Sequence, residues 1–244
     1  FFQAEDGIRD RSPSRGLGDV YKRQGIGKAV VEQLQGDNNI YVANRSSDNL
    51  DLQKVTHIPY DAINDSLDTS LLPEQLDGFV YCPGSINLRP FRGLKPETFD
   101  EDFKINVMGA IKSLQAVLKK LQQSEQASIV FYSTVAVQTG MPFHASVAAS
   151  KGAIEGLTKS LAAEYAPKFR VNAIAPSLTD TPLADKFLNN ESKLEKASER
   201  HPLKSIGSAK DIAETTCFLL SDKSKWMTGQ IIHLDGGIGN LKTN

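Results

Sequence analysis

The sequence predicts an α/β fold: one domain built on a doubly wound parallel sheet flanked by helices. Three observations predict it. Short runs of strand length are apolar on both faces, helix-length amphipathic segments separate them, and no repeat or linker interrupts residues 25–244. Apolar strands that alternate with helices are typical of a parallel sheet covered on both sides. Right-handed crossovers then place any ligand beyond the carboxyl ends of the strands.

The strands are predicted where β-branched and aromatic residues cluster. These runs are, in order, IYVAN (residues 40–44), KVTHIPYD (54–61), DGFVYC (77–82), SIVFYS (128–133), FRVNAIAP (169–176) and QIIHLDGG (230–237). Helices are predicted in the segments around them, where apolar residues recur at helical spacing. They cover residues 27–35, about 98–122, about 146–165, about 182–200 and about 209–220.

Residues 1–24 do not fit this pattern. FFQAEDGIRDRSPSRGLGDVYKRQ has no helical or strand periodicity, and it lacks the basic and apolar regions of a signal peptide. The string resembles the read-through translation of a sequencing-library adapter. We therefore interpret residues 1–24 as a non-native segment that replaces the first strand, and expect native sequence from Gly25 onward. The alternative is a disordered N-terminal arm.

Composition narrows the classes of function. The net charge is −1, so no basic field predicts binding to nucleic acid or to an anionic membrane. The apolar runs fall short of the roughly 20 residues that span a bilayer. Cys82 and Cys217 form no disulfide framework or metal-ligand spacing, which is typical of a reducing compartment. We expect a cytoplasmic protein that acts on a small molecule and holds no metal.

Loops at the predicted strand ends indicate a dinucleotide site. Gly25, Ile26 and Gly27 open the first helix, where free N–H groups and the helix dipole favour a pyrophosphate. Asn44 and Arg45 follow the next strand. An acidic residue there would favour NAD, whereas an arginine favours the 2′-phosphate of NADP.

Two further strand ends agree with this interpretation. Asp61 ends one strand, and its carboxylate could accept the amino group of an adenine. Gly84, in CPGS (82–85), permits backbone to lie close to the cofactor. A glycine in a turn or an arginine in a loop also has ordinary structural explanations, so the prediction depends on the whole set. NADP is favoured, and NAD is the alternative.

The order of short motifs resembles the short-chain dehydrogenase/reductase family, which are single-domain Rossmann-like proteins of about this length. The motifs are GIG (25–27), YDA (60–62), CPG (82–84), KINVMGA (104–110), FYSTVA (131–136), SKGAIEGLTKSLAAE (150–164), RVNAIAPSLTDTP (170–182) and TGQIIHLDGG (228–237). No single motif is decisive. Their order and spacing over nearly all of residues 25–244 carry the resemblance.

The resemblance implies which residues bind the cofactor. They are Gly25, Ile26, Gly27, Asn44, Arg45, Asp61, Ala62, Pro83, Gly84, Lys151, Pro176 and Thr181. Thr181 would hold the nicotinamide carboxamide, and Ser177 stands where the family has glycine. The family's loop Thr-Gly-x-x-x-Gly-x-Gly would place Val20 at the threonine and Tyr21 at the first glycine. Because a tyrosine obstructs the close approach that glycine permits, we expect this literal chain to bind cofactor less well than its parent.

The family pattern also implies a catalytic set, and one member is missing. In the family a tyrosine protonates the carbonyl oxygen, and a lysine four residues later binds the ribose and lowers the tyrosine pKa. A serine hydroxyl contacts the substrate, and an asparagine helps to hold a water. Lys151, Thr134 and Asn106 stand at the lysine, serine and asparagine positions. The tyrosine position is Val147, whose isopropyl group cannot transfer a proton.

Another side chain would have to supply the proton. His144, at the entrance of the same helix, titrates near neutrality and is the alternative donor. Ser146 is expected to cap the helix N-terminus. Tyr132 and Tyr81 stand at strand ends near the site, and Tyr132 is expected to pack in the core.

Three functions are consistent with these residues. The favoured one is an NAD(P)-dependent oxidoreductase that acts on a small carbonyl or alcohol, with NADP(H) preferred. The alternatives are a catalytically silent dinucleotide-binding protein, serving as a sensor or scaffold, and non-redox chemistry on the same frame. A silent protein would not need the set that orients the nicotinamide, so the enzyme is favoured. The substrate would be shaped by residues 182–202, whose mixed charge favours neither a sterol nor an acyl chain, and the resemblance implies a homodimer or homotetramer.

Overall fold

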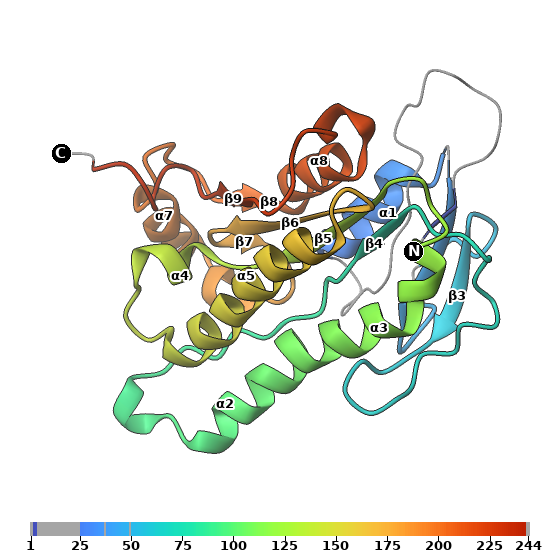
Figure 1. The fold of residues 1–244 in the computed structure, drawn as a ribbon. Coiled ribbons are helices and arrows are strands. Elements are labelled where there is room, and N and C mark those ends of the chain that lie inside the picture. Colours follow the sequence, from blue (N-terminus) through green and yellow to red (C-terminus); the bar gives the residue numbers. More distant parts are fainter. Residues whose placement is uncertain (1, 4–24, 37, 49, 243–244) are drawn as a thin grey trace.

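In the computed structural model, a central sheet lies between two layers of helices (Figure 1). The structure describes residues 2–3, 25–36, 38–48 and 50–242. Val20 and Tyr21, expected at the nucleotide loop, lie outside the described residues, as does most of the segment before Gly25. The interpretation of that segment as non-native sequence therefore stays a prediction.

The sheet has seven strands. Their spatial order is β3 (Val55–Pro59), β2 (Asn39–Asn44), β1 (Phe2–Gln3), β4 (Gly78–Val80), β5 (Ala127–Tyr132), β6 (Phe169–Pro176) and β9 (Ile231–Leu234). The pairs β2–β3, β4–β5, β5–β6 and β6–β9 are parallel. Each strand predicted from the sequence is present, and the doubly wound α/β fold is confirmed.

One strand departs from the parallel arrangement. β1 lies between β2 and β4 and is antiparallel to both: its two residues pair with β2, and Phe2 also pairs with Gly78 of β4. A gap between two strands presents backbone N–H and C=O groups on both sides, and a short segment can pair with them in either direction.

Helices cover both faces of the sheet (Figure 1). One face carries α1 (Ile26–Leu34) and α8 (Ala209–Leu220), which pack against each other, and the other carries α2 (Pro96–Phe103), α3 (Gly109–Leu121) and α5 (Ala145–Tyr165). The shorter elements are η1 (Phe91–Gly93), α4 (Val135–Thr139), α6 (Asp185–Leu188), α7 (Glu191–Glu199), η3 (Asp222–Ser224) and the paired strands β7 (Thr179–Asp180) and β8 (Gly207–Ser208). A cluster of buried side chains lies under each layer.

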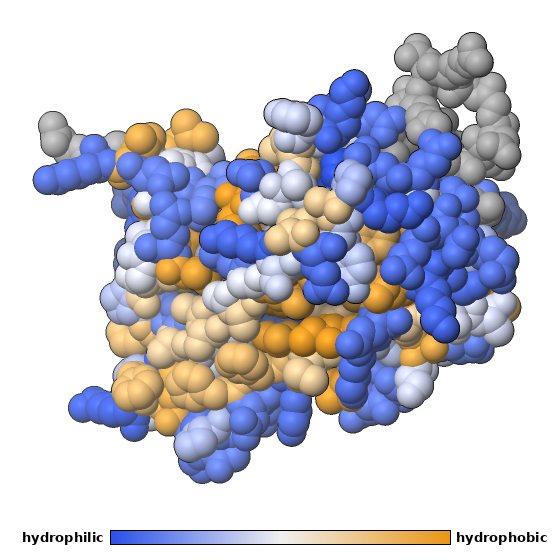
Figure 2. Space-filling model, in the orientation of Figure 1, coloured by the Kyte–Doolittle hydropathy of each residue, from blue (hydrophilic) through white to orange (hydrophobic). Residues whose placement is uncertain are grey.

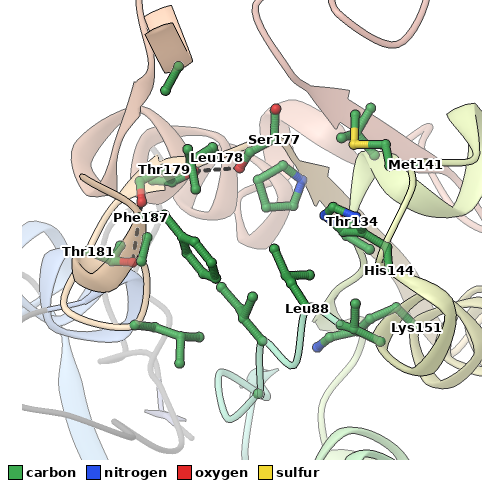
Figure 3. Close-up of a pocket in the computed structure, with 18 of the residues that line it drawn as sticks. Leu88, Thr134, Met141, His144, Lys151, Ser177, Leu178, Thr179, Thr181 and Phe187 are labelled. Atoms are coloured by element: carbon green, nitrogen blue, oxygen red, sulfur yellow. Dashed lines mark hydrogen bonds between the residues drawn. The ribbon is translucent and has the colours of Figure 1, made fainter. Parts of the chain in front are cut away.

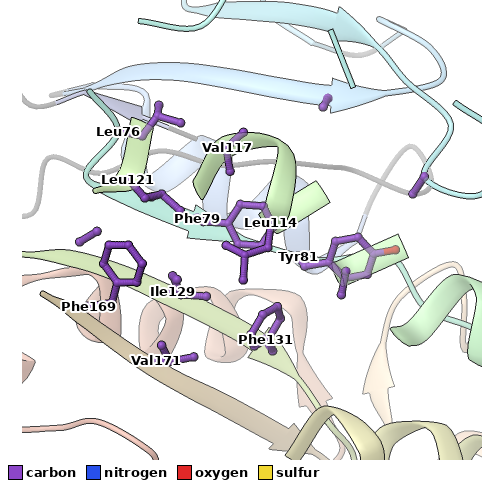
Figure 4. Close-up of a cluster of buried hydrophobic side chains, with 14 of the residues drawn as sticks. Leu76, Phe79, Tyr81, Leu114, Val117, Leu121, Ile129, Phe131, Phe169 and Val171 are labelled. Carbon is purple, nitrogen blue, oxygen red and sulfur yellow. The ribbon is translucent and has the colours of Figure 1, made fainter. Parts of the chain in front are cut away.

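The aromatic part of the core lies between the sheet and α3. Figure 4 shows Phe79 of β4 and Phe131 of β5 beside the α3 residues Leu114 and Val117. The two rings meet edge to face, with centroids 6.2 Å apart, which is a favourable arrangement for aromatic pairs. This packing fixes the neighbouring strands β4 and β5, whose carboxyl ends carry the site described below.

The long helix predicted over about 98–122 is interrupted. Between α2 and α3 the chain forms one π-helical turn, η2 (Lys104–Met108), which contains Asn106. Such turns often occur at functional sites. Gly109 follows directly, and a Cβ there would collide with the Tyr81 hydroxyl. That hydroxyl donates to the Ile105 carbonyl over 2.6 Å, so the irregular turn is held against β4.

The predicted helix at about 182–200 is two helices. α6 ends at Leu188, and α7 begins after Asn190, whose side chain accepts a hydrogen bond from the Lys193 N–H. An asparagine that caps a new helix ends the preceding one, because its own backbone is extended rather than helical. Within the described ranges, no helix is both long and apolar enough to cross a membrane.

Candidate active site

A cavity of about 430 Å³ opens at the carboxyl ends of β4, β5 and β6 (Figure 3). This is where ligands bind in doubly wound sheets. The predicted site residues among its lining are Ile26, Gly84, Thr134, His144, Lys151, Pro176 and Thr181. The others do not line it: Gly25, Gly27, Asn44, Arg45, Asp61, Ala62, Pro83 and Asn106. The cavity therefore extends from the start of α1 to the start of α5.

Lys151 and Val147 lie one turn apart on α5, and both line the cavity. Val147 is 5% exposed, so a branched hydrocarbon occupies the position at which the family pattern has a phenol. Lys151 is 8% exposed, and its Nζ donates to the Tyr132 carbonyl over 3.0 Å. Burial lowers the pKa of Lys151 to about 8, although Cys82 and Asp102 act in the opposite direction. The ammonium group is therefore more acidic than that of an ordinary lysine.

Asn106 stands just behind the cavity wall. Its amide nitrogen donates to the hydroxyls of Ser85 (3.1 Å) and Ser150 (2.9 Å). A Cβ on Gly84 would lie 3.2 Å from the Asn106 Oδ1 and 3.4 Å from the Lys151 Nζ. Only glycine permits this spacing without a shift of its neighbours, so Gly84 lets the end of β4 approach the lysine.

Thr134 follows β5 and caps α4. Its Oγ1 accepts a hydrogen bond from the Ala136 N–H over 3.3 Å. The preceding Ser133 donates to the Glu155 carboxylate over 2.5 Å. Both residues line the cavity. The Thr134 hydroxyl is left with its own proton to donate to a ligand, since it acts as an acceptor in the cap.

His144 is the N-cap residue of α5, and it lines the cavity. Its Nδ1 lies 2.7 Å from the Pro142 carbonyl. Because a carbonyl only accepts, Nδ1 carries the proton in this contact.

Ser146 does not cap α5, contrary to the sequence-based expectation. Its hydroxyl donates to the Asp102 carboxylate over 2.5 Å. Asp102 is fully buried and also accepts from the Ser85 hydroxyl and the Asn87 amide, at 2.5 and 2.7 Å. A hydrogen bond to a carboxylate is stronger than one between neutral groups, so this contact orients the Ser146 side chain toward α2. This acidic centre behind Ser85 was not found from the sequence.

Tyr132 and Tyr81 are packing residues in this structure. The Tyr132 hydroxyl pairs with Thr216 at 2.7 Å, and burial raises its pKa well above the ordinary value. The Tyr81 hydroxyl is held by the Ile105 carbonyl. Each phenol belongs to one of the two clusters of buried side chains, and its hydroxyl is already hydrogen-bonded there, so neither is available as an acid.

The start of α1 is suited to an anion. Gly25 is its N-cap residue, without a side-chain cap and with no acidic residue in the first turn. Space around Gly25 is open, because a Cβ there would meet no described atom within 4 Å. Uncapped N–H groups at the positive end of the helix dipole fit a phosphate group. These residues therefore fit a dinucleotide in which the phosphates lie at α1 and the reactive ring lies at Lys151.

The residues expected around the adenosine lie away from the cavity. The Asn44 side chain contacts His57 Nε2 at 2.7 Å. Asp61 accepts hydrogen bonds from the Ile63 and Asn64 N–H groups. The bond from Ile63 is the main reason that the pKa of Asp61 is lowered, and the bonds from Asn64 and the charge of Arg45 act in the same direction. Arg45 is exposed beside this loop, so its guanidinium is accessible to a ligand in the solvent.

Ser177 shows what replaces the family's glycine after Pro176. Its hydroxyl is paired with His201 Nε2 at 2.8 Å, and His201 Nδ1 is held by the Ala197 carbonyl at 2.8 Å. Thr181 lies further along the same loop, and its hydroxyl donates to the Thr179 carbonyl over 3.3 Å. The Ser177–His201 contact ties this loop to the end of α7.

Three cavity-lining cations of α7 were also missed: Lys193, Lys196 and Arg200 at its end. Their spacing of three and four residues was the available signal. The acidic residues of the same segment make its overall charge mixed, and this conceals the spacing of the cations.

Comparison with known proteins agrees with the fold. A sequence model of a family described as enoyl-(acyl carrier protein) reductase matches residues 20–239. The chain is 36% identical over 154 residues to the peroxisomal 2,4-dienoyl-CoA reductase of Saccharomyces cerevisiae, covering 63% of this chain and 52% of that one. It is 36% identical over 146 residues to the 3-oxoacyl-(acyl-carrier-protein) reductase of Thermotoga maritima, covering 59% and 58%. The chain thus spans between half and three fifths of the length of these two curated relatives.

A solved structure matches more of the chain. A short chain dehydrogenase family protein from Francisella tularensis superposes with a TM-score of 0.84 at 28% identity, covering 93% of this chain and all of that one. A gluconate 5-dehydrogenase from Burkholderia cenocepacia, solved in complex with NADP and tartrate, has the same TM-score at 21% identity, with 94% and 96% covered. The second likeness concerns the fold alone. Together with the family match over residues 20–239, these findings establish that the chain belongs to the short-chain dehydrogenase/reductase family.

Proposed function

We propose that this chain is an NAD(P)-dependent oxidoreductase that reduces a small carbonyl compound or oxidises the corresponding alcohol, with NADP(H) favoured. The observation that carries the proposal is a single cavity. Its lining includes Ile26 at the uncapped start of α1, Thr134 at the end of β5 and Lys151 on α5. An anion-binding helix end, a hydroxyl and an ammonium group are thereby gathered beyond the strand ends. The names of the curated relatives, which are reductases, agree with it.

In this proposal, different residues of the chain bind different parts of the cofactor. The N–H groups at the start of α1 bind the phosphates, Arg45 attracts the 2′-phosphate of NADP, and Thr181 and Lys151 orient the ring and its ribose. When bound, the nicotinamide supplies or accepts a hydride. The chain's own side chains must then bind the carbonyl oxygen and move one proton.

We propose Lys151 as the proton donor in place of the absent tyrosine. Val147 is small, so it leaves Lys151 open to the cavity from the preceding turn. A general acid acts best when its pKa lies near the working pH, and burial brings the pKa of this lysine to about 8. The Thr134 hydroxyl, with its proton free, would donate a hydrogen bond to the same carbonyl oxygen. Asn106 holds Ser85 and Ser150 in place behind them.

A pH profile tests the identity of the acid. If Lys151 donates the proton, kcat for ketone reduction stays level below a pKa of about 8. It then falls about tenfold per pH unit above that value, because only the protonated form donates. Alcohol oxidation shows the opposite dependence. A decline in kcat that is lost in His144→Ala would instead assign the proton to His144, the alternative donor inferred from the sequence.

The function itself is tested by binding and by turnover. We expect calorimetry to detect association of the chain with NADPH, and a panel of short ketones to support oxidation of NADPH above the rate without protein. NADPH binding with no turnover on any ketone or alcohol would indicate the silent dinucleotide-binding protein. Absence of heat with both NADPH and NADH would overturn the proposal.

The preference for NADP(H) has its own test. Arg45→Gln is expected to weaken NADPH binding about tenfold, which is typical of one lost charge-assisted contact, and to leave NADH binding unchanged. Lys54→Gln is a matched control, because Lys54 is an exposed cation just before β3 that pairs with Asp51 at 3.7 Å. Equal losses for the two cofactors would remove the assignment of Arg45.

We also propose that the chain forms a homodimer or homotetramer, as its family resemblance implies. Figure 2 shows apolar surface over α5 and between α5 and α3. α5 also carries the small exposed residues Ala149 and Gly156, which would let a second helix approach closely. Light scattering checks the proposal, and a monomer at micromolar concentration would contradict it.

A further inference from the structure

We propose that the substrate carries an anionic group at the end remote from its carbonyl, and that the cationic face of α7 recognises this group. The proposal deepens the oxidoreductase function and rests on it. It concerns Lys193, Lys196 and Arg200, all of which line the same cavity as Lys151.

The charges of α7 are segregated around its axis. A helix turns about 100° per residue, so Lys193, Lys196 and Arg200 fall within an arc of about 60°. The buried Ala197 lies next to that arc, which marks the side of α7 that faces the protein. Of the acidic residues of the segment, Glu191 and Glu195 fall on the opposite side, and Glu199 falls about 60° beyond the edge of the arc. Helix-dipole effects favour an acid in the first turn and a base in the last, but they do not sort charges by side.

The described lining of the cavity is rich in positive charge. Among the described residues that line it there is no aspartate or glutamate, whereas Lys151, Lys193, Lys196 and Arg200 are all cations. Within the described part of the chain, no ion pair involves Lys196 or Arg200. Lys193 Nζ is held by neutral oxygens, of Lys186 and Asn189, at 3.1 and 2.8 Å. Like charges along one wall repel one another, and an anion bound there would relieve this repulsion.

Apolar side chains also line the cavity beside Lys151. Figure 3 shows Leu88 and Phe187 projecting into the space between Lys151 and the loop that carries Thr181. Lys151 reaches the cavity from α5, whereas the three other cations reach it from α7. The matching substrate has a carbonyl at one end, a short apolar segment, and an anion such as a carboxylate at the other.

Matched pairs of ligands test this inference. The probes are 4-oxopentanoate, 5-oxohexanoate and 6-oxoheptanoate, each compared with its uncharged methyl ester. The readouts are kcat/KM with NADPH and, separately, the Kd of each probe for the chain loaded with NADP, which needs no turnover. For the best chain length we expect the acid to be preferred about tenfold over its ester, with KM rising with salt for the acid only.

A double variant assigns the preference to α7. Lys196→Gln with Arg200→Gln is expected to remove the preference for the acid, to leave kcat for the ester unchanged within about twofold, and to leave the Kd for NADPH unchanged. Lys210→Gln removes the same type of charge from the exposed face of α8, where it pairs with Glu214 at 3.9 Å, and should preserve the preference. Circular dichroism of the double variant confirms that it is folded.

The outcomes separate the two proposals. Equal kcat/KM for acids and esters would overturn the inference and leave the oxidoreductase standing. Tighter binding of acids without turnover would support the anion site and count against the oxidoreductase. If the double variant lost NADPH affinity and kept its preference for acids, the α7 cations would serve the cofactor, and the inference would fail.

Discussion

The two ends of the cavity place positive charge in opposite environments. At the α5 end, Lys151 is 8% exposed and its ammonium group is held by the Tyr132 carbonyl. At the α7 end, Lys193, Lys196 and Arg200 are exposed. Burial makes the charged form of Lys151 costly, so this group readily releases its proton. Exposed cations keep their charge and act by attraction over a distance. The same unit of charge can thus serve proton transfer at one end and recognition at the other.

The largest expected effect is at the buried end. Lys151→Met should lower kcat for ketone reduction by about 100-fold or more, the usual contribution of a general acid. The free energy of unfolding near neutral pH should rise at the same time. The reason is that the unfolded chain binds the lysine proton more tightly than the folded chain does, so the charged lysine destabilises the fold below its folded pKa of about 8.

Enzyme assays and urea unfolding check both parts of this prediction. Lys159→Met, at an exposed lysine of the same helix, is the control and should change neither quantity appreciably. A kcat for Lys151→Met within about threefold of the unaltered chain would show that the proton comes from elsewhere.

The next effect concerns the acidic centre that supports the buried end. Asp102→Ala should destabilise the fold by about 2–4 kcal/mol, because the donors Ser85, Asn87 and Ser146 lose a fully buried acceptor. Asp102→Asn keeps one acceptor oxygen and should cost less. Chemical unfolding measures both. If the two variants were equally stable, the hydrogen bonds of Asp102 would not be what holds the start of α5.

A smaller effect tests the missing phenol. Val147→Tyr should raise kcat about tenfold, because it adds a second acid one turn before Lys151. Val147→Phe adds the same ring without the hydroxyl and should give no increase. The ratio of the two rates isolates the hydroxyl, since any cost of crowding in the cavity is common to both. A ratio near one would mean that the ring does not reach the reacting oxygen.

The smallest effect is expected at the exposed end. Removing the charges of Lys196 and Arg200 should change the free energy of unfolding by less than about 0.5 kcal/mol, as is usual for exposed side chains without buried partners. Thermal unfolding checks it. A loss above about 2 kcal/mol would show that these side chains hold α7 in place. The cations of α7 would then have a structural role, and the difference between the two ends of the cavity would be smaller than proposed.

The elements that the sequence predicted well have strong local patterns. The strands β5 and β6 are rich in apolar and β-branched residues, and both were expected within one residue of their observed bounds. α8 begins after Ser208, whose side chain forms a capping box with that of Asp211. Because these signals depend only on a few neighbouring residues, they can be recognised in a single sequence.

Features that depend on distant partners were not predicted. The prediction that Ser146 caps α5 was wrong, because its hydroxyl donates instead to Asp102, which is far away in the sequence. The long helix over about 98–122 gave no sign of the π-helical turn at Asn106, and the break between α6 and α7 was missed. Such features are decided by contacts between elements, which propensity does not encode.

The sequence by itself determined the fold class and the strand ends that face the cavity. It also determined that Val147 and Lys151 share one face of α5, because helical spacing follows from the backbone alone. Only the tertiary structure decided how deeply Lys151 is buried, which group takes its hydrogen bond, and that the cations of α7 face the same cavity. Burial and the convergence of remote side chains depend on how the elements pack, and the order of residues along the chain does not record them.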